Sequence, residues 1–95
     1  MHTVVRQYSG ANAGALFDQL EAKAQEVERI LRGVPGFVSY SLFRTSGGGV
    51  SVTVCEDKAG TDESSRRAAA WVKENMATNV APPAISEGEN ILQLR

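Results

Sequence analysis

Few side chains in this sequence of 95 residues can carry chemistry. It contains one cysteine, Cys55, one histidine, His2, and one tryptophan, Trp71. A single cysteine forms neither an internal disulfide nor a thiolate zinc site, and no histidine lies near it in sequence to act as its base. Acidic residues at 56–57 and 62–63 are typical of a strand end followed by a helix start, where they need no cation. We therefore expect no metal site and no resident cofactor.

Small polar and aromatic residues instead indicate a binding site for a small organic molecule. They occur in two runs that alternate between polar and apolar residues and in one helical stretch: Ser39, Ser41, Phe43, Thr53, Cys55 and Trp71. Hydroxyl groups inside a cavity can orient a ligand, but small residues also allow two sheets to approach closely. Both interpretations stay open, and the pattern identifies no catalytic residue.

Trp71 and Cys55 each have an alternative, purely structural interpretation. Trp71 can wall an aromatic ligand, or it can anchor a helix on a sheet, because large aromatic side chains mostly contribute burial. Cys55 can be reactive, or it can be the buried and inert thiol that is usual for a cysteine in a strand.

Three further polar side chains can contact a ligand. Tyr8 and Tyr40 can each donate a hydrogen bond to a ligand oxygen, or fill the core with a tethered hydroxyl group. Arg6 can bind an acidic ligand, although a solvated arginine is the ordinary state of this residue. The pattern does not decide to which side of its strand Arg6 points.

The periodicity of apolar residues predicts the elements that position these side chains. Alternation predicts strands over residues 3–8, 37–45, 50–56 and 84–94. Spacings of three and four predict one helix over residues 13–32, with Asn12 as its cap. A second helix is expected to run to about Ala77 after a cap at Thr61 or Asp62. Turn residues at 34–36 and 46–49 separate the strands from their neighbours.

This order predicts a single α+β domain over residues 1–95, of the ferredoxin-like β-α-β-β-α-β type. Residues 37–45 and 50–56 form a hairpin around a glycine-rich turn. Two β-α-β units in tandem give a four-stranded antiparallel sheet with two helices on one face.

The other face of that sheet is expected to pair with a second copy of the chain. Grouping the hairpin residues by polarity puts Phe37, Ser39, Ser41, Phe43, Ser51, Thr53 and Cys55 on this face, and none is charged. An uncharged face suits another sheet better than water. Because a chain this short has a thin core, a twofold homodimer is predicted.

Composition narrows the classes of partner. A net charge of −1 gives no basic footprint for nucleic acid. No stretch approaches the roughly 20 apolar residues of a membrane span, and residues 1–6 lack the features of a secretory signal. With a lone cysteine, these features predict a cytoplasmic protein that binds neither nucleic acid nor membrane.

The element order and two local sequences resemble a known family. The sequences are Val34-Pro35-Gly36-Phe37, at the entry to the second strand, and residues 66–72, Arg-Arg-Ala-Ala-Ala-Trp-Val. Together they are similar to the dimeric α/β-barrel superfamily, and in style to its small antibiotic-biosynthesis-monooxygenase-like proteins of uncharacterised function. The resemblance covers nearly the whole chain and concerns structure more than activity.

The resemblance implies a homodimer whose sheets form a barrel, with a cleft between sheet and helices in each subunit. Some members oxidise aromatic compounds without a cofactor, and others degrade haem with a histidine on the second helix. Here that helix has no histidine, which argues against haem, although Trp71 and Asn75 lie one turn apart on it.

Two functions therefore remain as expectations. The first is a small-molecule-binding protein, including a monooxygenase-like enzyme that needs no cofactor and acts on an aromatic or quinol compound. The alternative is a non-catalytic dimeric binding or interaction module, which the lack of a nucleophile–base pair favours.

Overall fold

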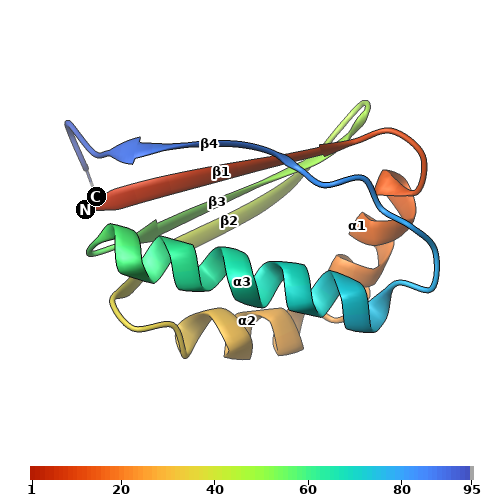
Figure 1. Cartoon of the computed structure of the whole chain (residues 1–95), viewed down its shortest axis with the longest axis horizontal. Helices are drawn as coiled ribbons and strands as arrows, with labels where there is room; N and C mark the ends of the chain where they lie inside the picture. Colours follow the sequence, from red (N-terminus) through yellow and green to blue (C-terminus); the bar gives the residue numbers. More distant parts are fainter. Residues whose placement is uncertain (95) are drawn as a thin grey trace.

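The computed structural model describes residues 1–94 and forms a four-stranded sheet with three helices (Figure 1). In chain order the elements are β1 (His2–Ser9), α1 (Ala13–Ala22), α2 (Ala24–Arg32), β2 (Phe37–Thr45), β3 (Gly48–Cys55), α3 (Lys58–Asn75) and β4 (Ala84–Glu89). All strand pairs are antiparallel, in the order β2-β3-β1-β4. All three helices lie on one side of the sheet (Figure 1). The predicted α+β ferredoxin-like fold is confirmed.

The predicted first helix is in fact two helices. Lys23 leaves the helical conformation with φ −112° and ψ 30°, and α1 and α2 meet there. Residues 22–24, where the break lies, are Ala-Lys-Ala and include no proline or glycine that would indicate it. It arises because α1 packs over β3, whereas α2 packs between α3 and β2. Asn12, predicted as the cap, has φ 71° and makes no capping bond; its side-chain amide donates instead to the Asn79 carbonyl at 2.7 Å.

The third helix begins earlier than predicted. Asp57, and neither Thr61 nor Asp62, is its N-cap, because the Asp57 carboxylate accepts a hydrogen bond from the Gly60 amide at 3.0 Å. Gly60 resembles a loop residue in the sequence. The structure needs it inside the helix, since a Cβ there would lie 2.8 Å from both the Cys55 Cβ and the Pro35 carbonyl oxygen.

The last strand ends earlier than predicted. Strand β4 stops at Glu89, and Ile91, Leu92 and Leu94, expected to form its firmest part, are outside the strand and exposed. The pairing with β1 ends where β1 itself ends, with His2 opposite Glu89. Among residues 1–94, no strand lies beside residues 91–94 to bond with them. Apolar alternation alone therefore overestimates the strand.

The two faces of the hairpin also differ from the prediction. The register places Ser41 opposite Val52 and Phe43 opposite Val50, while Thr53 lies opposite Tyr40. Residues opposite each other share a face, and register depends on the turn and on packing, not on likeness of polarity. Grouping residues by polarity was therefore wrong: Ser51, Thr53 and Cys55 face the helices.

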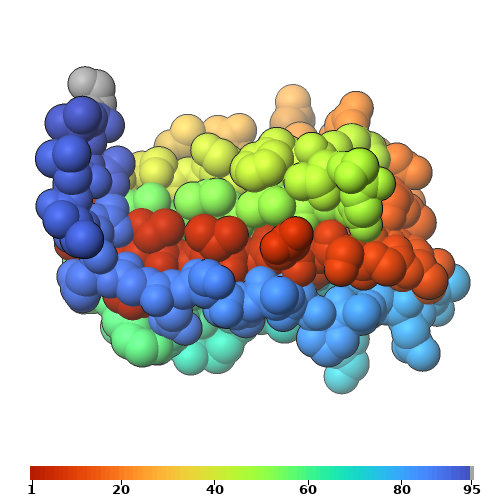
Figure 2. Space-filling view, turned by 90° about the horizontal axis from the view of Figure 1, so that it is seen from above, coloured from red at the N-terminus to blue at the C-terminus, as the bar shows by residue number. Residues whose placement is uncertain are grey.

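The sheet face away from the helices is called the open face below. From the register it comprises Thr3, Val5, Gln7, Ser39, Ser41, Phe43, Val50, Val52, Val54, Ala84, Ser86 and Gly88. Figure 2 looks onto this side, with β1 in red between β3 in green and β4 in blue. The face carries no charged residue, as predicted, but its valines make it more apolar than predicted.

The core lies between the sheet and the helices. Its buried cluster consists of Tyr8, Ala13, Leu16, Phe17, Leu20 and Trp71. The rings of Tyr8 and Phe17 pack edge to face with centroids 6.0 Å apart. His2, the one histidine, is buried in β1, where its Nδ1 lies 2.9 Å from the Thr61 hydroxyl.

Candidate functional site

Two clefts flank the core, one at each edge of the sheet. The α2–β2 cleft has a volume of about 530 Å³ and lies between helix α2 and the edge strand β2. The α3–β4 cleft, of about 450 Å³, lies between helix α3, residues 76–83 and strand β4. Both volumes fall within the range of small-molecule pockets, roughly 300–1,000 Å³.

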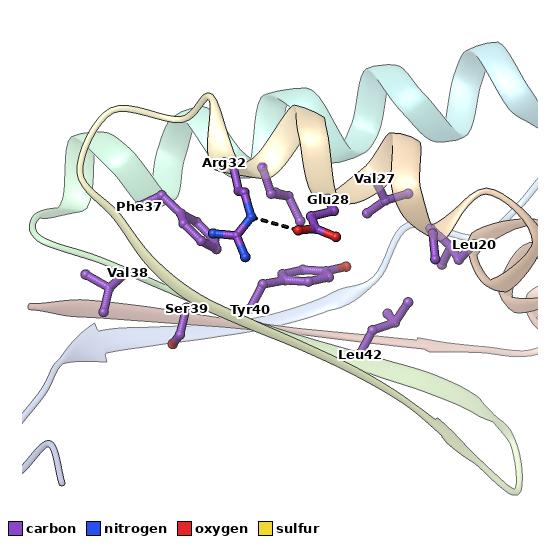
Figure 3. A pocket seen from close by; sticks show the side chains of 11 residues that line it. Leu20, Val27, Glu28, Arg32, Phe37, Val38, Ser39, Tyr40 and Leu42 are labelled. Atoms are coloured by element: carbon purple, nitrogen blue, oxygen red, sulfur yellow. Dashed lines mark hydrogen bonds and ion pairs between the residues drawn. The ribbon is translucent and has the colours of Figure 1, made fainter. Parts of the chain in front are cut away.

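The walls of the α2–β2 cleft are mainly apolar (Figure 3). Leu20, Val27, Leu31, Val38 and Leu42 line it together with Phe37. Phe37 lies above the ring of Tyr40, together with an ion pair (Figure 3). In this pair the Arg32 Nε donates a hydrogen bond to the Glu28 carboxylate at 2.8 Å. This pair is exposed, so it contributes little to stability.

Tyr40 provides the titratable hydroxyl group of this cleft. Burial raises the pKa of Tyr40 to about 12, against the opposing effect of the nearby Arg6 cation. The hydroxyl is therefore protonated at neutral pH. It can donate a hydrogen bond to a ligand oxygen, but as a general base it is poorly matched.

Arg6 lies at the centre of the interface between sheet and helices and is only 2% exposed. Its guanidinium donates to four hydroxyl groups, those of Ser51, Thr53, Ser64 and Ser65, at 2.6–3.3 Å. Two of these come from β3 and two from α3, so Arg6 joins the sheet to the helix. The question left open by the sequence is answered: Arg6 points inward.

The six residues predicted to bind a ligand do not line one cavity within the chain. Ser39 borders the α2–β2 cleft beside a bulge between Phe37 and Ser39, but its register places it on the open face and its hydroxyl group points away from the cleft (Figure 3). Ser41 and Phe43 lie on the open face, and Phe43 is 49% exposed.

The other three predicted residues are buried on the helix side of the sheet. Thr53 accepts from Arg6 at 3.1 Å. Burial raises the pKa of the Cys55 thiol, which favours the interpretation of an inert, packed cysteine. Trp71 is 5% exposed within the core, and its indole N–H donates to Glu26 at 3.3 Å, which favours the core-anchor interpretation.

Arg6 and the two α3 serines are the residues that sequence reasoning did not combine. Ser64 and Ser65 lie 58 and 59 positions from Arg6, and no local pattern links them. The only available signal was the position of Arg6 two residues from both Val4 and Tyr8, which puts these three side chains on the same face of the strand.

Within residues 1–94 no three histidine, cysteine or acidic side chains come together in an arrangement suited to a metal ion. Over the same residues no helix is long and apolar enough to cross a membrane.

Solved structures share this fold. The comparisons include a protein of unknown function from Nitrosomonas europaea, with 18% identity and a TM-score of 0.73 over 99% of this chain and 91% of that one. A second is MhuD, a heme-degrader from Mycobacterium tuberculosis with two hemes in its active site, with 21% identity and a TM-score of 0.64 over 99% and 98%. A third is ActVA-Orf6, a monooxygenase of Streptomyces coelicolor in complex with nanaomycin D, with 18% identity and a TM-score of 0.64 over 99% and 89%.

No protein-family model matches the chain, and no curated protein is similar to it in sequence. At these identities the solved structures establish the fold and leave the activity to be tested. The chain therefore has the fold of the antibiotic-biosynthesis-monooxygenase-like proteins, the resemblance that its sequence predicts.

Proposed function

We propose that this protein binds a small, largely apolar organic molecule, of the phenol or quinol class, in the α2–β2 cleft. The observation that supports this most is the placement of Tyr40, a protonated hydroxyl with a raised pKa, in the floor of an apolar cleft of about 530 Å³. A cleft of this size with few polar groups and a perturbed titratable residue is the usual form of a ligand site.

In its catalytic form the site would act as a cofactor-independent monooxygenase. An electron-rich aromatic substrate passes electrons to O2 itself; when a CH2 group becomes a carbonyl, one oxygen atom enters the product and the other leaves as water. The protein then orients the substrate and excludes water, and the Tyr40 hydroxyl holds a substrate oxygen. That MhuD and ActVA-Orf6 bind heme and nanaomycin D on this fold supports a small-molecule role.

The test is a titration with anthrone and 1,4-naphthohydroquinone, followed by thermal shift and by oxygen uptake. We expect binding to stabilise the protein, and Tyr40→Phe, which removes the hydroxyl group in the cleft, to lower the affinity by about 2- to 10-fold, the worth of one hydrogen bond. Ser41→Ala, on the same strand but on the open face, is the matched control and leaves the affinity unchanged. Binding without oxygen uptake supports a binding protein over an enzyme. No binding of either compound contradicts the proposal.

The open face favours a second candidate, a dimeric module without catalysis. Its twelve residues include four valines on the two central strands, one phenylalanine on β2 and no charge, so two copies can bury this face against each other. A homodimer is compatible with both functions, and the molar mass of the protein in solution tests it.

A further inference from the structure

Arg6 is buried, and no acidic side chain among residues 1–94 forms an ion pair with it. Its only hydrogen-bond partners among residues 1–94 are hydroxyl groups. On the neighbouring elements β4 and α3, Glu87 pairs with Lys58 at 3.3 Å and Glu63 pairs with Arg67 at 2.9 Å. A buried cation is ordinarily paired with an anion, since hydroxyl dipoles replace only part of its lost hydration. The fold thus keeps a desolvated positive charge with no negative partner of its own.

One edge of the Arg6 guanidinium is arranged for a carboxylate. The Nε and Nη2 groups both donate to the same acceptor, the Ser65 hydroxyl, at 3.3 and 3.0 Å. These are the two parallel N–H groups that a carboxylate binds with its two oxygens. Ser51 and Thr53 hold the Nη1 group from the opposite side and fix the orientation of the plane.

This edge faces the α3–β4 cleft. Arg6 and Ser65 both line that cleft, and Ser65 is only partly buried, so its hydroxyl can rotate away. Farther along α3, Lys73 adds a second cation to the wall, and no acidic residue lines the cleft. The remaining wall is mainly apolar, with Val72, Met76 and Ile85.

We propose that the α3–β4 cleft binds an organic carboxylate with an apolar body, its carboxylate taking the place of the Ser65 hydroxyl on the Nε–Nη2 edge of Arg6. The apolar body lies between α3 and β4, and Lys73 attracts the anion at the cleft wall. This site is separate from the α2–β2 cleft and is independent of the function proposed there.

The experiment compares two acids with their neutral amides. The probes are 2-naphthoate against 2-naphthamide, and decanoate against decanamide, followed by amide chemical shifts and by titration calorimetry. We expect an acid to bind at least about tenfold more tightly than its amide, because a charge-assisted bidentate pair exceeds a neutral hydrogen bond. The two pairs separate a planar aromatic ligand from an acyl chain. Shifts should map to Ser65, Ala69 and Val72.

Ala69 offers a matched pair of variants that leaves Arg6 unchanged. It is exposed, lines the cleft and lies one helical turn after Ser65. Ala69→Asp places a carboxylate beside the proposed site, where it repels the ligand or takes its place, and should lower acid binding at least about tenfold. Ala69→Asn has the same size without the charge and should retain the preference for the acid.

Three results would overturn the proposal: equal affinity for acid and amide, equal binding to the Asp and Asn variants, or no binding of any probe at millimolar concentration. Shifts confined to Ser39 and Tyr40 would place the ligand in the α2–β2 cleft and would also overturn it. Ser65→Ala provides a second measurement. It removes the competing hydroxyl, so acid binding should be equal or tighter, and a loss of binding contradicts the exchange.

Discussion

Among single residues, Tyr40 makes the stability of the folded chain depend on pH in the alkaline range. Its pKa of about 12 in the folded chain exceeds the ordinary value of 10.0, and burial also raises the pKa of Tyr8. Between pH 10 and 12 the unfolded chain has lost a proton that the folded chain retains, so raising the pH favours unfolding. The stabilisation is complete below pH 10 and is lost as the pH approaches 12.

Tyr40→Phe should therefore flatten the alkaline limb of the stability profile. A shift of about 2 pKa units corresponds to at most roughly 3 kcal/mol in the free energy of unfolding. Urea unfolding at pH 8 and pH 11.5 measures this: the wild-type loses more stability than the variant over that interval. Equal losses would show that the Tyr40 hydroxyl is not desolvated.

For single residues, the sequence predicts local properties but not contacts between distant segments. For Tyr40 two interpretations were recognised, a donor to a ligand and a core residue with a tethered hydroxyl group, because residue type and alternation are visible locally. The hydroxyl groups that surround Arg6 could not be recognised together, because Ser51 and Ser64 come from two elements that only the tertiary fold brings together. Ser39 and Thr53 were grouped by likeness, whereas register places them on different faces.

At the scale of elements, the glycine-rich hairpin is less flexible than its composition implies. Gly48 and Gly49 belong to β3 and are not part of a loose turn. A Cβ on Gly48 would overlap the Tyr8 carbonyl oxygen, and one on Gly49 would overlap the ring of Phe17. The glycines therefore allow the hairpin to approach β1 and helix α1 closely.

Gly49→Ala should destabilise the protein although alanine suits a strand better than glycine. The overlap with the buried Phe17 ring costs about 1–3 kcal/mol, which exceeds the gain in backbone entropy. Gly47→Ala is the control, because its Cβ meets nothing within 4 Å. Chemical denaturation measures both, and a neutral Gly49→Ala would mean that α1 can move off the hairpin.

Element types were predictable, and several boundaries were not. The alternation of β2 and the Pro35-Gly36 turn, where Gly36 has φ 76°, are local properties. The break at Lys23 is not local, since it reflects the different surfaces under α1 and α2. The end of β4 at Glu89 likewise depends on the length of its partner strand.

At the scale of the whole molecule, the open face predicts the oligomeric state. Phe43, half exposed, and Val52 lie on it in neighbouring strands. If two copies bury this face, a charge at its centre should dissociate them, because an unpaired charge in an apolar interface is costly.

We expect the wild-type chain to be a dimer at micromolar concentration and Val52→Lys to be a folded monomer. Gln25→Lys, on the exposed surface of α2, adds the same charge and should leave the dimer intact. Light scattering over a wide concentration range gives the molar mass, and circular dichroism confirms that both variants fold. A monomeric wild-type chain would contradict the shared barrel.

The strand order has one further consequence, for the time at which the sheet can be completed. Strand β1 is the first of the four strands to be made, and it lies inside the sheet. One of its two neighbours is β4, so His2 can pair only after Glu89 has been made. Such distant pairing makes folding slow relative to helical proteins. During synthesis one side of β1 keeps its backbone donors and acceptors unpaired until residues 84–89 have emerged, and an unpaired edge is prone to join another chain. Of the four strands, the first to be made is therefore the one whose backbone stays open to wrong pairing for the longest time.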